Sequence, residues 1–401
     1  MDHPNLRFPD STAPRPERPL AGLRVIDFTS MIAGPYCTRW LADLGASVIK
    51  VEAPGGDVMR GRPPLREQHS AFFGHMNGGK RCIALDLKKP QAVAIAQRLV
   101  DDADVMIEAF RPGVIARLGL GAAAMRARNP RLVYCSISGY GQSTGVAQRP
   151  AYAPVVHATS GYDWVLSGGA GQTPRSSTVP LADILTGMFA TQAIQAALLH
   201  RQASGQGTVI DVNLMDSVMN VLPFEFQAAQ FGWGQPRPTY WPLRCADGHV
   251  LVTPINTRNY QNLCVAMGHP EWIDDPLLAA DAARFANWDE YMRRIEAWTS
   301  TRDGDECERI LADQGVPCAR YRSIEEAMRD PQFAERDSFA EVRDAVGPFQ
   351  VTRLPYALGG QRPATGASVA AVGAHTREVL DELGCTAAEI DALLASKAAL
   401  A

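Results

Sequence analysis

The chain has 401 residues, of which 46% are hydrophobic and 20% charged, and its net charge is −4 at pH 7. This composition is typical of a globular protein with a large core, and the length favours two or three domains. No cluster of Lys and Arg stands out, so we do not expect nucleic acid as a partner. No apolar run is long enough to cross a bilayer, so we expect no membrane association. Residues 1–18 are polar and rich in proline and lack the apolar centre of a signal peptide, which predicts a flexible arm on a cytoplasmic protein.

The eight cysteines stand singly along the chain. None forms a Cys-x-x-Cys pair, and no histidine lies at zinc-finger spacing, so we expect no metal site. Reduced and mostly buried thiols are therefore the expected state. No single cysteine stands out as a nucleophile.

The first elements of the chain predict parallel β-structure. A β-rich run at 23–28 is followed by Gly34 and Pro35, and a proline suits the first turn of a helix. A second β-rich run follows at 47–51, and a strand, a helix and a strand in this spacing imply parallel pairing. The alternation continues, which predicts a doubly wound α/β core. Further strands are expected at 83–85, 105–108, 132–137 and 208–212, with helices at 90–100, 114–118 and 214–222.

The amino-acid composition changes at two places in the middle of the chain. Residues 139–180 are rich in Gly, Ser, Thr and Pro, which predicts a long loop of functional or disordered type. A strong helix is expected from Ile184 to about Gln202, with Gly205 beyond its end. The segment Gly232–Pro238 is again rich in Gly, Trp and Pro and marks a domain boundary.

The sequence beyond that boundary predicts a second domain and a return to the first. A β-hairpin is expected around Asp247 and Gly248, followed by helices, and one or two terminal helices are expected at 376–394. We therefore expect an α/β domain that is interrupted by a smaller α+β domain. The predicted parts are a large domain at 19–225, a small domain at 226–330 and a return to the large domain at 331–401.

A dinucleotide site is the first functional hypothesis that the βαβ start invites. Glu52 ends the second strand, where a carboxylate would bind a ribose hydroxyl. The loop after the first strand, however, carries one glycine, Gly34, followed by Pro35, and not the Gly-x-Gly-x-x-Gly pattern that lets a pyrophosphate approach the backbone. We therefore favour a surface role for Glu52 and do not expect NAD.

A series of motifs spread over most of the chain, from about Pro19 to Leu394, resembles the class III CoA-transferase family. Each motif is weak alone, but all of them occur in the same order as in the family. They are Leu20–Phe28, Ala33–Pro35, Leu44–Glu52, Leu85–Lys88, Val105–Gly113, Asp183–Gly187, Ser204–Gly207, Asp211–Ser217 and Gly315–Cys318.

The resemblance implies an enzyme that moves CoA from an acyl-CoA to a free carboxylic acid. It implies a Rossmann-like large domain built from both chain ends, a smaller middle domain, and a homodimer of two interlocked chains. It also implies acyl-CoA and CoA as substrates, with no tightly bound cofactor and no metal. Succinyl-CoA is a candidate donor, because succinate is common among relatives.

Asp183 matches the catalytic aspartate of the family. The resemblance implies that its carboxylate attacks the thioester and passes through an anhydride and an aspartyl-CoA thioester. The residues themselves place Asp183 at or near the N-cap of the helix after the Gly- and Ser-rich segment. A capping carboxylate alone would explain that position, and the two roles are compatible because the positive helix end stabilises a carboxylate.

The CoA-binding residues are also expected from the match to the family. Lys88, Arg111 and Arg117 would hold the phosphates of CoA. Leu85 and Phe110 lie in matching segments, and Ala33 would lie against the pantetheine end. Taken alone, each cation could equally be a solvated surface charge, and Phe110 could belong to the core.

Departures from the family pattern bear on the substrate. Ile32 stands where oxalate-using members carry glutamine, and Ala153 stands where they carry a carboxylate, so formate and oxalate are not expected and a larger acyl group is favoured. A second carboxylate of the substrate would need a cation, and the candidates are Arg149, Arg175 and Arg244.

Two alternative functions stay open at the level of sequence. An α-methylacyl-CoA racemase shares the fold but needs two acid/base groups, and its histidine would stand where this chain has Ala153. His157 is nearby but out of register, and a core histidine is the simpler interpretation. A non-catalytic CoA-binding protein is the other alternative, and the retention of Asp183 argues against it.

Overall fold

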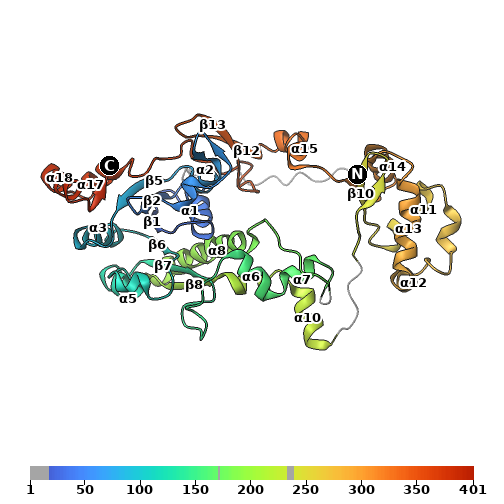
Figure 1. Cartoon of the computed structure of the whole chain (residues 1–401), viewed down its shortest axis with the longest axis horizontal. Coiled ribbons are helices and arrows are strands. Elements are labelled where there is room, and N and C mark those ends of the chain that lie inside the picture. The colour runs from blue at the N-terminus through green and yellow to red at the C-terminus, as the bar shows by residue number, and fades with distance from the viewer. Residues whose placement is uncertain (1–17, 170–171, 233–238) are drawn as a thin grey trace. The chain divides into compact units, whose positions relative to one another are not determined.

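The computed structural model describes residues 18–169, 172–232 and 239–401. Apart from Arg18, the predicted arm lies outside these residues, and so does most of the predicted boundary segment Gly232–Pro238. Contacts divide the chain into two compact units, Met1–Trp233 with Ala334–Ala401 and Gly234–Phe333. The first unit is thus built from both ends of the chain (Figure 1).

A seven-stranded sheet forms the centre of the first unit. Its strands lie in the order β14-β5-β2-β1-β6-β7-β8, and all pair in parallel except β14 at one edge. Apart from β14, this is the strand order of doubly wound dinucleotide-binding folds, so the predicted α/β core is confirmed. The strands are β1 Arg24–Phe28, β2 Ser47–Glu52, β5 Arg81–Leu85, β6 Val105–Glu108, β7 Val133–Ser138, β8 Val209–Asn213 and β14 Ala399–Leu400.

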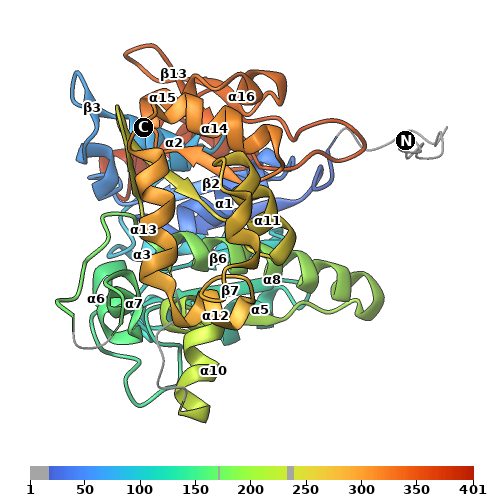
Figure 2. The same ribbon diagram turned by 90° about the vertical axis from the view of Figure 1, so that its right-hand side faces the viewer.

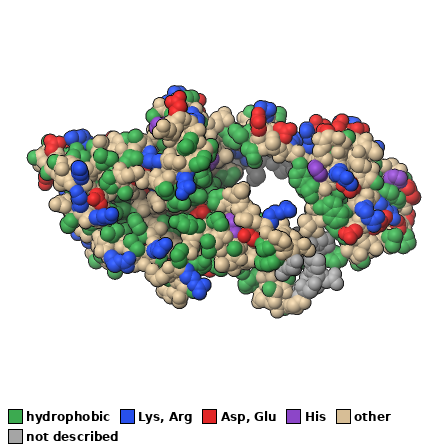
Figure 3. Space-filling model, viewed as in Figure 1, with side chains coloured by type: hydrophobic (Ala, Val, Ile, Leu, Met, Phe, Trp, Pro, Cys, Tyr) green, Lys and Arg blue, Asp and Glu red, His purple; other side chains and the backbone are tan. Residues whose placement is uncertain are grey.

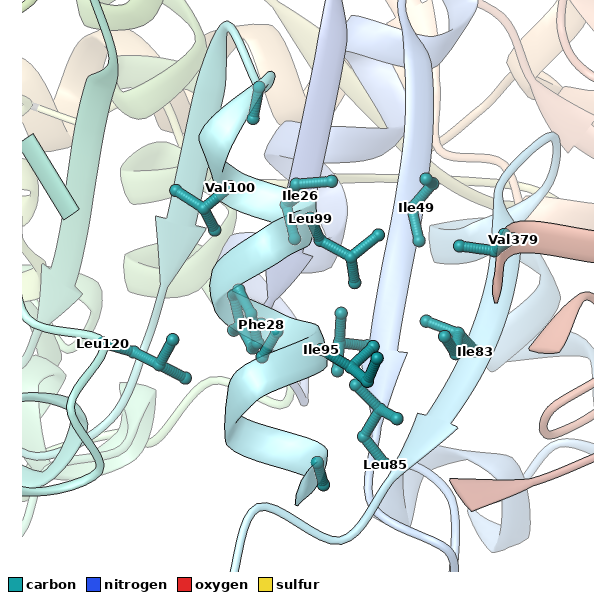
Figure 4. Packing of buried hydrophobic residues seen from close by; sticks show 14 of the residues in the cluster. Ile26, Phe28, Ile49, Ile83, Leu85, Ile95, Leu99, Val100, Leu120 and Val379 are labelled. Carbon is teal, nitrogen blue, oxygen red and sulfur yellow. The ribbon is translucent and has the colours of Figure 1, made fainter. Parts of the chain in front are cut away.

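Helices cover both faces of this sheet, because neighbouring side chains along a strand point to opposite faces. On one face, Ile95 and Leu99 of α3 belong to the same buried cluster as Ile26 and Ile83 of the strands (Figure 4). On the other face, α1 and α8 pack against each other and on the sheet. These helices are α1 Ala33–Asp43, α3 Pro90–Asp101 and α8 Leu181–Ser204.

The order of the strands reverses between β1 and β6. From β1 the chain adds β2 and then β5 on one side, and β6 then pairs with the other side of β1. The loops that follow β1 and β6 therefore lead to different sides, which opens a crevice at the carboxyl ends of these strands. Doubly wound proteins bind their ligands in this crevice.

The predicted loop at 139–180 contains two helices, so the prediction of irregular structure was wrong for this part. They are α6, Ala153–Ser160, and α7, Tyr162–Leu166, and Gly161 separates them with a left-handed φ of 85°. Pro154 stands in the first turn of α6, where it is tolerated. Val156 is buried on the inner side of α6, which packs on α8 and α9 (Leu214–Met219). Burial against neighbours thus supports two short helices that composition alone does not predict.

Helix α8 begins at Leu181 rather than at Ile184 and ends at the predicted Gly205, which has a left-handed φ of 71°. It is the one helix, among the residues that the structure describes, that is long and apolar enough to span a membrane by length and composition. An apolar run long enough to cross a bilayer was not expected from the sequence. The helix packs on α1, β7 and β8, which is the position of a core helix.

The second unit has a core of its own, which includes Tyr260, Tyr291 and Trp298. The predicted hairpin is confirmed in β9 and β10, and β11 completes a three-stranded sheet. Figure 2 shows the helices of this unit, among them α11, α13 and α14. The main elements are β9 Leu243–Cys245, β10 Gly248–Val252, β11 Cys318–Arg320, α11 Thr257–Ala266, α13 Trp288–Thr299 and α14 Gly304–Asp313.

Two further details of the fold concern buried side chains. Arg39 of α1 connects the returning part of the chain to the first part, because its guanidinium donates to the carbonyls of His75 and Thr352 at 2.7 and 2.8 Å.

All eight cysteines are free, and all but Cys318 are buried, which confirms the expected state of the thiols.

Candidate active site

A cavity of about 220 Å³ lies in the crevice where the strand order reverses. Its volume is below the roughly 300–1,000 Å³ of pockets that enclose a drug-sized ligand, so it has room for the reacting end of a large substrate. The loops after β1, β6 and β7 form its walls together with the start of α8. The lining residues are Ser30–Met31, Ala33–Gly34, Ala109–Pro112, Ile137–Gly139, Ala147, Arg149–Tyr152, Asp183 and Leu214.

Asp183 is the carboxylate of this cavity. It is the third residue of α8, whose N-cap position is taken by Pro180, so Asp183 stands in the first turn and not at the cap. Its side chain is half-buried, and none of the described residues donates a hydrogen bond to it or forms an ion pair with it. Burial disfavours the charged form and raises the pKa of Asp183 to about 7.

A glycine brings Asp183 to the cavity wall. Gly187 lies one turn after Asp183 on α8, and a Cβ atom at Gly187 would lie 2.7 Å from the carbonyl oxygen of Ala33. A side chain there would push α8 away from the start of α1. Because Gly187 has none, the first turn of α8 lies beside the loop that carries Ala33 and both residues line one cavity.

Buried charges hold the loop between β1 and α1. Met31 has a left-handed φ of 67°, which is strained for a non-glycine residue. Its N–H lies 3.4 Å from Oδ1 of Asp57, whose Oδ2 forms a buried ion pair with Lys50 at 3.0 Å. The Lys50 ammonium also donates to the carbonyl of Thr29 at 2.8 Å. The Lys50–Asp57 pair therefore fixes the backbone that forms one wall of the cavity.

A second buried cluster, centred on Asp27, stabilises the same loop between β1 and α1. Asp27, at the end of β1, accepts hydrogen bonds from the hydroxyls of Thr29 and Thr38 at 2.5 and 2.6 Å and pairs with Lys80 at 3.2 Å. Burial opposes its charge, but the ammonium groups of Lys80 and Lys50 outweigh burial and hold the pKa of Asp27 at about 2. The carboxylate thus stays ionised and keeps its hydrogen bonds at any pH at which the protein works.

Two guanidinium groups line the cavity. Arg111 follows β6 and Arg149 precedes α6, and both side chains are exposed. Neither forms an ion pair with a residue in the described part of the chain. Both exposed guanidinium groups are therefore available to anionic groups of a ligand. Phe110 also lines the cavity, where it is partly buried.

The other expected binding residues do not line this cavity. Leu85 is buried in the core cluster that also contains Ile95 of α3 (Figure 4), and its side chain does not line the cavity. Lys88 is exposed in the turn between β5 and α3, and Arg117 is exposed at the end of α4, Val114–Arg117. Both cations follow the carboxyl ends of strands, as Arg111 does, so they lie on the same edge of the sheet as the cavity.

The sequence profile of CoA-transferase family III matches residues 20–376. The chain belongs to CoA-transferase family III. Its curated relatives include a probable fatty acyl-CoA transferase of Mycobacterium tuberculosis, which is 33% identical and covers 85% of this chain and 92% of its own. A succinate–glutarate CoA-transferase of Agrobacterium fabrum is 34% identical and covers 92% of this chain and 97% of its own. A succinyl-CoA:mesaconate CoA-transferase of Haloarcula hispanica is 32% identical and covers 91% and 96%.

Solved structures agree with this assignment. The crystal structure of a CAIB/BAIF family protein from Brucella suis is similar with a TM-score of 0.81 and 31% identity, and covers 91% of this chain and 99% of its own. An orthorhombic crystal structure of the Mycobacterium tuberculosis relative has a TM-score of 0.82 and 31% identity over 91% of this chain and 100% of its own. The chain is therefore a CoA-transferase, and enzymes of this class take CoA thioesters as substrates.

The three arginines that the sequence offers as candidates to bind a substrate carboxylate occupy different positions in the structure of this CoA-transferase. Arg149 lines the cavity with Asp183. Arg175 is exposed and does not line it. Arg244 belongs to the second unit and pairs with Glu296 at 3.3 Å. Of these three residues, Arg149 is the one that lines the cavity within the described part of the first unit.

Ile32 does not line the cavity, so the larger acyl group expected from this residue stays a prediction. Ile32 is buried in a cluster with Met59, Phe73 and Met76 and does not line the cavity, although both of its neighbours do. Ile32 is the N-cap residue of α1, where the chain turns, so its side chain enters the core. Met31 and Tyr152 line the cavity but were not predicted from the sequence, although the position of Met31 in the loop after β1 was a usable signal.

Proposed function

We propose that this CoA-transferase moves CoA from an acyl-CoA to a free carboxylic acid with Asp183 as covalent nucleophile. The observation that carries the proposal is an unpaired, half-buried carboxylate at the start of a helix, inside the cavity at the strand reversal. The names of two relatives support succinyl-CoA as a donor. The enzyme would act in the cytoplasm.

The reaction proceeds in two exchanges. A carboxylate oxygen of Asp183 attacks the thioester carbonyl, the carbon–sulfur bond breaks, and CoA leaves as a thiolate while an acyl–aspartyl anhydride forms. The thiolate then attacks the aspartyl carbonyl, which releases the first carboxylic acid and leaves an aspartyl-CoA thioester. The acceptor acid repeats these steps in reverse, so the free energy of the thioester is retained throughout.

The environment of Asp183 suits this chemistry. A carboxylate that is poorly solvated is a better nucleophile than one in water, and a site that is closed during the reaction would keep water away from the anhydride. Burial raises the pKa of Asp183 to about 7, and the positive end of α8 favours the charged form of the carboxylate. At neutral pH a large fraction of the enzyme then carries the reactive carboxylate.

CoA would extend from the cavity along the edge of the sheet. Ala33 would contact the pantetheine end beside Asp183, and Phe110 and Arg111 would lie next along the ligand. Lys88 and Arg117 would bind the phosphates, and Leu85 would contribute its backbone at most, because its side chain is buried. Arg149 would face the acyl group.

The racemase alternative needs a second base opposite Asp183. His157 does not line the cavity, and its Nε2 atom accepts a hydrogen bond from the Ala182 N–H at 3.1 Å. Ala153 is buried in the core. Neither position therefore supplies the second base, which favours the transferase.

The enzyme would work as a dimer of interlocked chains. Large apolar side chains are exposed on the first unit, among them Tyr152 on the segment before α6 and Leu199 near the end of α8, with 63% and 67% of their surface accessible. Figure 3 shows exposed hydrophobic side chains among the polar ones on the face that it presents. A second chain that covers such surfaces would also close the site to water.

The substitution Asp183→Asn tests the nucleophile. An amide keeps the shape of the side chain but does not attack a thioester, so transfer from succinyl-CoA to a panel of carboxylic acids should fall more than about 1,000-fold. In the unaltered enzyme, hydroxylamine should convert the aspartyl thioester into a hydroxamate on Asp183, and mass spectrometry should find it only when acyl-CoA is present.

Asp289→Asn is a matched control, because Asp289 also stands in the first turn of a helix, α13, but in the second unit. It should leave transfer unchanged. A label on a cysteine, or an Asp183→Asn enzyme with near-normal turnover, would contradict the proposed mechanism.

A further inference from the structure

The start of α8 is capped by a side chain from another helix. The first N–H groups of any helix lack partners within it, and Pro180 at the N-cap position supplies no side-chain acceptor. His157 of α6 supplies one instead, because its Nε2 atom accepts from the N–H of Ala182 at 3.1 Å. Ala182 directly precedes Asp183, so this hydrogen bond acts on the peptide that carries the reactive carboxylate.

The His157 ring has no freedom to move away from this contact. Its accessible surface is 0%, and its centroid lies 5.0 Å from the ring of Tyr162 in α7. Helix α6 packs on α7, α8 and α9, so the ring is surrounded on all these sides. A displacement of the ring would therefore shift the first turn of α8 with it.

The hydrogen bond also decides the protonation of the ring. Nε2 accepts a proton here, so a neutral His157 carries its own proton on Nδ1. Burial lowers the pKa of His157, which is consistent with a neutral ring. The Nδ1 atom is buried without a partner in the described part of the chain, and so is the Oδ1 atom of Asp163 in α7.

The unpartnered Nδ1 atom of His157 and the unpartnered Oδ1 atom of Asp163 complement each other as donor and acceptor. A buried donor and a buried acceptor without partners are each costly, and the negative charge of Asp163 acts directly on His157. One ordered water molecule that accepts from Nδ1 and donates to Oδ1 would satisfy both atoms. It would also keep the proton on Nδ1 and leave Nε2 free to accept from the Ala182 N–H.

We propose that His157 is a positioning residue for Asp183, with Asp163 fixing its tautomer. The neutral ring holds the first turn of α8 so that the Asp183 carboxylate faces the thioester in the cavity. This inference rests on the proposed role of Asp183 as nucleophile. His157 touches neither the cavity nor the substrate and acts only through the backbone of Ala182.

Two substitutions separate positioning from simple packing. His157→Phe keeps a flat ring beside Tyr162 but has no acceptor for Ala182, so kcat should fall about tenfold to 100-fold with KM for succinyl-CoA within about twofold. His157→Gln keeps an acceptor oxygen and should recover kcat to within about threefold of the unaltered enzyme. Rescue by glutamine but not by phenylalanine, at comparable thermal stability, would support the proposal. Equal kcat values in the two variants would overturn it.

Nitrogen NMR of the ¹⁵N-histidine-labelled enzyme tests the tautomer without any turnover. The resonance that disappears in His157→Gln should show a protonated Nδ1 and an unprotonated Nε2 over the whole pH range of activity, and Asp163→Asn should disturb it. A His157 ring protonated on Nε2, or on both nitrogens, would overturn the proposal even if the enzyme is active.

The role of Asp183 as nucleophile and the role of His157 as positioning residue can be tested separately. If the unaltered enzyme forms no hydroxamate on Asp183, the proposed nucleophile is wrong, whatever the His157 resonances show. If the hydroxamate forms normally and His157→Phe forms it at an unchanged rate, only the positioning role is wrong.

Discussion

Asp183 is subject to two opposing influences. Burial in the cavity raises its pKa to about 7, and the start of α8 favours its charged form. A structural capping residue would be exposed and hydrogen-bonded to backbone N–H groups. Asp183 has no such hydrogen bond among the described residues, so it does not cap α8, and this agrees with its proposed role as nucleophile.

The pH dependence of the enzyme follows from this pKa. Attack requires the carboxylate, and the raised pKa means that Asp183 binds a proton as the pH falls through 7. We expect kcat/KM for acyl-CoA to be constant above about pH 8 and to fall by about tenfold per pH unit well below 7. Initial rates between pH 5 and 9 measure this. A profile that stays flat down to pH 5 would show that Asp183 remains ionised in the free enzyme.

At the scale of elements, the close packing of α1 and α8 creates the site. The two helices start from different parts of the chain, yet Ala33 at the start of α1 and Asp183 in the first turn of α8 line one cavity. Gly187 permits this approach, because a Cβ atom there would lie 2.7 Å from the Ala33 carbonyl oxygen. The atom that such a Cβ would meet belongs to the backbone of Ala33 and not to a flexible side chain, so relieving the clash would require a shift of the backbone.

Gly187→Ala should therefore damage both stability and activity. Overpacking costs about 1–3 kcal/mol, which outweighs the gain of about 1 kcal/mol from the better helix propensity of alanine. We expect a lower melting temperature and a loss of kcat of at least about tenfold, because Asp183 moves with the helix. Calorimetry and transfer assays measure the two effects.

Gln192→Ala is the control for this change, since Gln192 is exposed on the same helix. Its effect on stability should stay within about 0.5 kcal/mol, with unchanged turnover. A Gly187→Ala enzyme that is as stable and active as this control would show that α8 does not need the close approach.

At the scale of the whole molecule, helix α10 (Pro223–Phe231) has no buried residue, although it is largely apolar. Phe226 and Phe231 expose 48% and 79% of their surface. An isolated helix with such a face would not be stable in water without a partner. The proposed dimer supplies one, since a second chain would cover this helix.

The dimer should be intimate and slow to separate. Interlocked chains bury far more than the ~1,600 Å² of a standard interface, so no monomer is expected on dilution to nanomolar concentration. Mass photometry measures this. The double substitution Phe226→Asp and Phe231→Asp should yield monomers or soluble aggregates. Phe285→Asp, at an exposed phenylalanine of the second unit, should not. A stable, active monomer of the unaltered chain would contradict the dimer.

Local patterns in the sequence were sufficient for the parallel core. Runs such as Val105–Glu108 are apolar on both sides because both faces of the strand are buried, and their alternation with helices implies the βαβ order. Gly205 ended α8 as expected, because glycine readily adopts a left-handed φ. The ordered series of motifs along the chain identified the family, since such a series depends on chain order and not on spatial arrangement.

The tertiary structure decided which side chains meet. Strand order places the loops after β1 and β6 at one crevice, so Ala33, Arg111 and Asp183 come together from distant parts of the chain. The direction of a side chain in a loop also depends on its packing, which is why Ile32 enters the core while Arg149 reaches the cavity. The contact of His157 with Ala182 joins residues 25 positions apart, and no periodicity along the chain encodes it. Sequence patterns thus determined the elements and the family, whereas the packing of helices on the sheet decided the geometry of the site.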